Sequence, residues 1–129
     1  MTKSKKSKQG LLKGSKISSR EACGEIVETR VKEFYSANMI KVEVGTTGFC
    51  DGDAGHGGRT YFSIIDLGCT AMSCQIFDGR REMNFDNFDN DGFGVVLGGD
   101  TELMTFLDAL KFAVDVLEMQ IRKRKREDA

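Results

Sequence analysis

One part of the chain has residue types that could do chemistry, namely residues 45–60, GTTGFCDGDAGHGGRT. This part combines six glycines with Arg59 and His56. A glycine-rich loop can turn backbone N–H groups toward an anion, while an arginine or histidine adds positive charge. We therefore expect this loop to hold a phosphate-bearing ligand. The predicted ligand-binding residues are Gly48, Phe49, Gly55, His56, Gly57, Gly58, Arg59 and Tyr61.

The same loop has a structural interpretation. It lacks the Gly-Lys-Ser/Thr ending of a P-loop, and the residues after it have the pattern of a strand, so no helix dipole is predicted to face the ligand. On this interpretation the glycines only permit tight turns in a long connection between strands. The sequence leaves both alternatives open.

Catalysis and metal binding have weaker signals. His56 is the only histidine, and no second base or orienting group stands at a fixed spacing from it, so we expect no catalytic residues and no enzyme. Cys50, His56, Cys69 and Cys74 lack the close Cys-x2-Cys spacing of zinc sites. Residues 87–92 match the first half of a calcium loop, but Gly98 stands where the bidentate glutamate belongs. No metal and no cofactor are predicted.

The charge of the chain is distributed unevenly. The net charge is −1, yet the first twenty residues carry seven positive charges and residues 122–129 a net +3, which leaves −11 on residues 21–121. We predict a disordered basic tail over 1–18, one domain over 19–121 and a charged C-terminal tail over 122–129. An acidic body does not favour specific nucleic-acid binding. Without a signal peptide or membrane segment, a cytoplasmic location is expected.

Hydrophobic periodicity predicts an α+β fold. Apolar residues at helical spacing indicate an N-terminal helix over 19–38, and a second stripe indicates a long C-terminal helix that Asp100 or Thr101 caps and that packs on the sheet. Between the helices we expect an antiparallel sheet of about five strands, at 40–44, 59–66, 71–77, 80–85 and 93–97, with a turn at Asp78-Gly79. Phe112 and Val116 lie outside the second stripe and suggest a homo-oligomer.

Two stretches carry a resemblance. The segment GDAGHGGRTY, preceded by VGTTG and followed by LGGD and Glu102-Leu103, resembles small proteins of phages and prophages over residues 40–118. The size and the order of elements are also similar to phage anti-defence proteins that sequester cyclic nucleotide signals of Thoeris and related systems. That second resemblance implies an oligomer in which arginines, loop amides and an aromatic residue hold a nucleotide without cleaving it.

These observations predict a phage anti-defence protein that sequesters a cyclic nucleotide or ADP-ribose-derived immune signal in the cytoplasm of an infected bacterium. Arg59 would grip the phosphates, and Tyr61 or Phe49 would stack on the base. The alternative is an acidic inhibitor that binds a host defence protein such as a CRISPR nuclease, through Asp86, Asp89 and Asp91. A small hydrolase that uses His56 is a third possibility.

Overall fold

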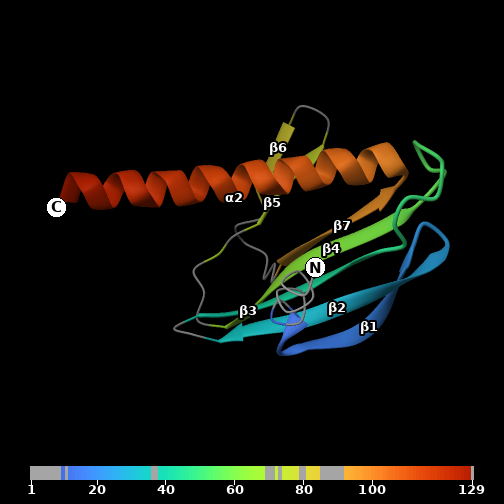
Figure 1. Cartoon of the computed structure of the whole chain (residues 1–129), viewed down its shortest axis with the longest axis horizontal. Helices are drawn as coiled ribbons and strands as arrows, with labels where there is room; N and C mark the ends of the chain where they lie inside the picture. The colour runs from blue at the N-terminus through green and yellow to red at the C-terminus, as the bar shows by residue number, and fades with distance from the viewer. Residues whose placement is uncertain are drawn as a thin grey trace.

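The computed structural model describes residues 10, 12–35, 38–68, 72, 74–78, 81–84 and 92–128. Within these residues, seven strands precede a long helix: β1 (Ser15–Ala22), β2 (Glu25–Tyr35), β3 (Met39–Thr46), β4 (Arg59–Gly68), β5 (Gln75–Asp78), β6 (Arg81–Asn84), β7 (Gly92–Gly98) and α2 (Asp100–Asp128). Five strands form one antiparallel sheet in the order β1-β2-β3-β4-β7, and β5 pairs with β6 in a separate ribbon. The fold is therefore α+β, with helix and sheet shown in Figure 1.

The two faces of the sheet differ. Phe62 of β4 packs edge-on against Phe106 of α2, with ring centroids 5.6 Å apart, so the helix covers the face that carries Phe62. Because side chains alternate along a strand, Tyr61 and Ser63 lie on the opposite face. On that face Glu43 is buried, and it accepts a 2.7 Å hydrogen bond from Thr29 and an ion pair from Arg20. The interior thus combines a few apolar side chains with a polar cluster in which Glu43 is paired, while the buried hydroxyl of Ser63 has no hydrogen-bond partner among the described residues.

Helix α2 covers only part of the sheet. Its first turns lie over β4 and β7, while its C-terminal half continues past the strands, as Figure 1 shows. The last turn carries Lys125 and Arg126, whose positive charges interact favourably with the negative end of the helix dipole. Within the described ranges, no helix is long and apolar enough to cross a membrane.

The predicted N-terminal helix over 19–38 is wrong. Strands β1 and β2 occupy this region, joined by a two-residue turn in which Cys23 and Gly24 both have positive φ, at 50° and 80°. The misleading signal is the spacing of Val27, Val31 and Tyr35, because steps of four residues fit one face of a helix and one face of a strand equally well. β-Branched residues such as Thr29 then favour the strand.

The predicted domain limits also change. Strand β1 begins at Ser15, so residues 15–18 belong to the sheet and not to a tail, and residues 1–9 lie outside the described residues. At the other end, residues 122–128 continue helix α2 and are not a separate tail. Tertiary pairing with β2 explains the first change, since residues 15–18 are too polar to signal a strand by themselves.

The later strands follow the prediction more closely. Strands at 40–44, 59–66 and 93–97 are confirmed by β3, β4 and β7. The hairpin is confirmed as the pair β5 and β6, although Asp78 is paired with Arg81 and so belongs to a strand and not to the turn. This pair forms its own ribbon, and β1 and β2 complete the five-stranded sheet in its place.

Candidate functional site

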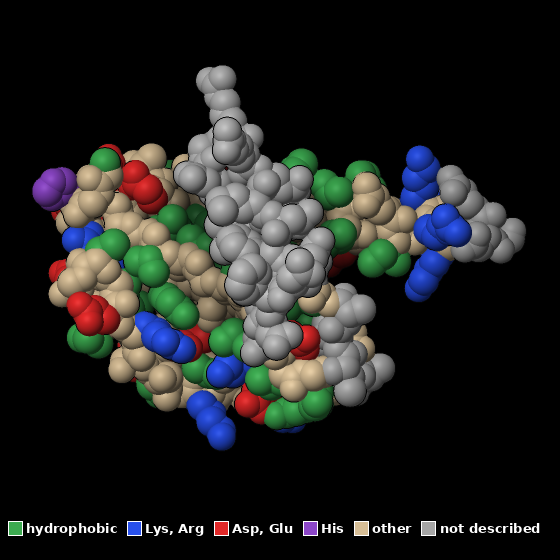
Figure 2. Space-filling model, turned by 180° about the vertical axis from the view of Figure 1, so that it is seen from behind, with side chains coloured by type: hydrophobic (Ala, Val, Ile, Leu, Met, Phe, Trp, Pro, Cys, Tyr) green, Lys and Arg blue, Asp and Glu red, His purple; other side chains and the backbone are tan. Residues whose placement is uncertain are grey.

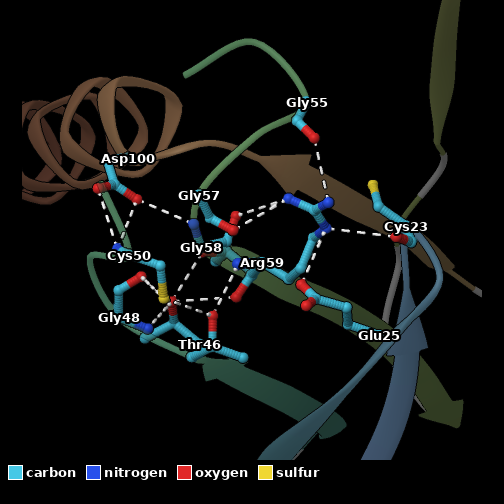
Figure 3. A network of polar contacts seen from close by, with 12 residues as sticks. Cys23, Glu25, Thr46, Gly48, Cys50, Gly55, Gly57, Gly58, Arg59 and Asp100 are labelled. Atoms are coloured by element: carbon cyan, nitrogen blue, oxygen red, sulfur yellow. Dashed lines mark hydrogen bonds and ion pairs between the residues drawn. The ribbon is translucent and has the colours of Figure 1, made fainter. Parts of the chain in front are cut away.

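The glycine-rich loop between β3 and β4 folds around the carboxylate of Asp100, the first residue of α2. Backbone N–H groups of Cys50 and Asp51 donate to its oxygens at 3.0 and 2.7 Å, and the N–H of Gly58 donates at 2.9 Å, as Figure 3 shows in part. The N–H of Gly52 adds a longer bond of 3.4 Å. The loop is therefore an anion-binding nest, and the anion it holds belongs to the same chain.

This environment controls the charge of Asp100. Hydrogen bonds from the backbone N–H groups of Cys50 and then Gly58 lower the pKa of the carboxyl below its ordinary 3.8, with smaller contributions from Asp51 and Gly52. Desolvation acts in the opposite direction and is outweighed. Asp100 is therefore ionised at neutral pH and keeps the loop attached to the helix.

The loop also caps the helix in return. Asp53 Oδ1 accepts hydrogen bonds from the backbone N–H of Thr101 at 2.9 Å and from its hydroxyl at 2.5 Å. Glu102 Oε1 accepts from the N–H of Ala54 at 3.1 Å. The prediction that Asp100 or Thr101 caps the helix is thus corrected: Asp53, far away in the sequence, provides the capping oxygen, and Asp100 reaches outward to the loop.

Arg59, the predicted phosphate-binding arginine, is bound within the chain. Its guanidinium donates to the carbonyl oxygens of Gly55 and Gly57, both at 3.1 Å, and to that of Cys23 at 3.3 Å. Glu25 forms an ion pair with it at 3.3 Å, and only 13% of the arginine side chain is exposed. Figure 3 shows how this one side chain joins the loop to the β1–β2 turn.

The structure divides the predicted ligand-binding residues into three places. Gly55, Gly57, Gly58 and Arg59 form the loop described above, and His56 is exposed at its edge, where it projects in Figure 2. Tyr61 faces the other side of the sheet, with the Arg20 guanidinium 5.2 Å from its ring centre. Gly48 and Phe49 instead border a groove beneath α2. The residues predicted for the alternative function, Asp86, Asp89 and Asp91, lie outside the described residues.

This apolar groove separates α2 from the neighbouring strands β2 and β3. Its volume is about 410 Å³, within the range of small-molecule sites. The described residues that line it include Leu103, Phe106, Leu107 and Leu110 of the helix, Val44, Gly45, Thr46 and Thr60 of the strands, and Leu12, Arg30, Gly48 and Phe49. Among these lining residues there is no carboxylate, histidine or cysteine.

Arg30 is the one charged side chain among the described residues of the groove lining. It is half-buried, and no hydrogen bond or ion pair holds its guanidinium within the described part of the chain. Arg59, by contrast, is saturated by internal acceptors. An apolar groove with a single available arginine can accept a molecule that has a flat or apolar part and one anionic group.

Comparison with known proteins gives no match: no family model, no curated protein and no solved structure matches the chain. The described residues also bring together no group of three histidine, cysteine or acidic side chains that could hold a metal ion. Cys23, Cys50 and Cys74 are free thiols, and Cys69 lies outside the described residues.

The sequence did not reveal the groove. The sequence predicts a helix at Arg30 and a tail at Leu12, so it cannot place either residue opposite Leu103 and Leu107. A usable signal was present in the run from Val27 to Val31, where β-branched Val27, Thr29 and Val31 alternate with Glu28 and Arg30. Assigned to a strand, that alternation places Arg30 on the face opposite Val27.

Proposed function

We propose that this protein sequesters a small anionic signal molecule without cleaving it, as a bacteriophage protein that counters a bacterial defence system. The ligand site in this proposal is the groove beneath α2, and the glycine loop is the scaffold beside it. The observation that carries the proposal is Arg30, which has no hydrogen-bond or ion-pair partner among the described residues and lies at the border of a largely apolar groove of about 410 Å³.

The chemistry of the groove supports a ligand of cyclic nucleotide type. A nucleobase is a planar ring that can stack on Phe49 or Phe106, and a phosphate can accept paired hydrogen bonds from the guanidinium of Arg30. The hydroxyls of Thr46 and Thr60, which lie 2.9 Å apart, provide polar contacts at the floor. No general base borders the groove among the described residues, which supports binding over hydrolysis.

The test is thermal melting of the full chain with cyclic mononucleotides, cyclic dinucleotides and cyclic ADP-ribose isomers, followed by heat release and mass spectrometry of the retained ligand. A ligand at about one hundred times its Kd should stabilise the folded state by about 2.7 kcal/mol. Recovery of the intact ligand supports sequestration. Recovery of a cleaved product, or no stabilisation by any member of the panel, refutes the proposal.

A pair of variants locates the site. Arg30→Gln should weaken binding about tenfold or more, because a charge-assisted hydrogen bond is lost. Lys32→Gln is the matched control, since Lys32 lies two residues along β2 on the same face but outside the groove lining. Equal weakening by both variants would indicate general charge attraction and would contradict a site at Arg30.

A further inference from the structure

The C-terminal half of helix α2 carries an apolar stripe that the described residues leave exposed. Val114, Leu117 and Ile121 are 51%, 60% and 57% exposed, although they continue the line of Leu103, Leu107 and Leu110 that faces the sheet. The helix runs past the strands here, as Figure 1 shows, and Figure 2 shows apolar side chains along the projecting part. Exposed aliphatic side chains in such a row indicate a binding surface.

The spacing of this stripe is that of a coiled-coil seam. Apolar residues recur in alternating steps of three and four at positions 103, 107, 110, 114, 117 and 121. This is the repeat of about 3.5 residues that lets two helices wrap around each other with their apolar side chains interlocked. The seam, defined as Leu107, Leu110, Val114, Leu117 and Ile121, differs from Phe112 and Val116, which lie outside it.

The charged residues beside the seam favour a second copy of this chain as the partner, with its helix antiparallel to the first. Lys111 and Glu118 each follow a seam leucine directly and flank the seam on the same side. Both are exposed. In an antiparallel pair of identical helices this side meets itself, so Lys111 of one copy lies close to Glu118 of the other, twice by symmetry. In a parallel pair the same positions would face Phe106 and Ala113, with no opposite charge.

We propose that two copies of this chain form a two-fold dimer through an antiparallel pairing of their α2 helices. Leu110 packs against Ile121 of the partner subunit, Val114 packs against Leu117 of the partner subunit, and the two-fold axis passes between Asp115 and Val116. Ion pairs between Lys111 and Glu118 set the direction. Since Leu107 and Leu110 also border the groove, the partner helix closes the outer end of the groove.

A charge exchange measured on the full chain by sedimentation equilibrium tests this arrangement. Lys111→Glu and Glu118→Lys should each raise the dimer Kd about tenfold, because each places like charges together at both ends of the pairing. The double variant K111E/E118K should restore the wild-type Kd. A double variant as weak as the single variants overturns the antiparallel pairing, and a monomeric wild type at high micromolar concentration overturns the dimer.

The seam itself has a matched control on the same helix. Leu117→Asp should abolish the dimer, whereas Met119→Asp should leave it intact, because Met119 is 55% exposed but lies on the far side of the helix from the seam. Both positions are open to solvent in a single chain, so circular dichroism should show both variants folded. Equal loss of dimer in the two variants overturns the assignment of the seam.

Discussion

Replacement of Gly58 by alanine tests whether the glycine loop is a fixed scaffold. A Cβ at this position would lie 1.9 Å from the carbonyl oxygen of Gly48, whereas ordinary contacts begin near 3.4 Å. The backbone at Gly58 and the backbone at Gly48 must therefore move apart by about 1.5 Å. That displacement breaks the bond from Gly58 N–H to Asp100 and the bond from Gly99 N–H to the Gly58 carbonyl. Overpacking costs about 1–3 kcal/mol and each lost bond about 1 kcal/mol.

The expected destabilisation is therefore about 4 kcal/mol, or a fall of roughly 16 °C in Tm at about 4 °C per kcal/mol. Gly55→Ala is the comparison, because Gly55 has a φ of +97° but nothing within 4 Å of an added Cβ. Only the backbone penalty applies there, about 1 kcal/mol. Urea unfolding of the two variants decides the question. A loss at Gly58 no larger than at Gly55 would refute the close packing of the loop.

Three further changes probe the charges that hold the fold. The pKa of Asp100 is lower in the folded state than in the unfolded state, so its contribution to stability is complete at a pH above the unfolded-state pKa and is lost as pH falls through the folded-state pKa. The free energies of unfolding of Asp100→Asn and wild type, measured in urea, should therefore differ at neutral pH and converge in strong acid. Arg59→Ala should reduce stability by about 3 kcal/mol in urea unfolding, since its bonds to three loop and turn carbonyls and to Glu25 are lost together. Arg20→Ala should reduce the free energy of unfolding by about 3 kcal/mol in calorimetry, because the buried carboxylate of Glu43 then keeps only the hydrogen bond from Thr29. Replacement of Glu43 as well, in a double variant, should lower stability little further.

The sequence predicts the second half of this fold better than the first. Alternation in Lys41, Val42 and Glu43 and the β-rich run after Arg59 identify their strands. The expected burial of the first strand is wrong at its end, because Glu43 is buried and Val44 is 41% exposed. At the N-terminus the period is ambiguous, and the decisive turn at Cys23-Gly24 has no strong signature before its φ values are known. Long-range pairing, which composition does not show, then decides between helix and strand.

The glycine content of residues 45–58 predicts a loop able to bind an anion, and whether it binds a ligand stays a prediction. Composition cannot show that the loop holds Asp100, some fifty residues away in the chain. Nor can composition show that carbonyl groups occupy the guanidinium of Arg59, whereas Arg30 has no such partner among the described residues. Both facts depend on which strands are neighbours in the sheet.

The attachment of the loop to the start of α2 also has a consequence for folding kinetics. Its hydrogen bonds join residues 42 to 50 positions apart, so the loop gains them only after the intervening strands have been brought together. Local hairpins such as β1–β2, whose partners are close in the chain, can form earlier. We therefore expect the loop to dock after the folding barrier, so that its substitutions mainly accelerate unfolding and leave the refolding rate nearly unchanged.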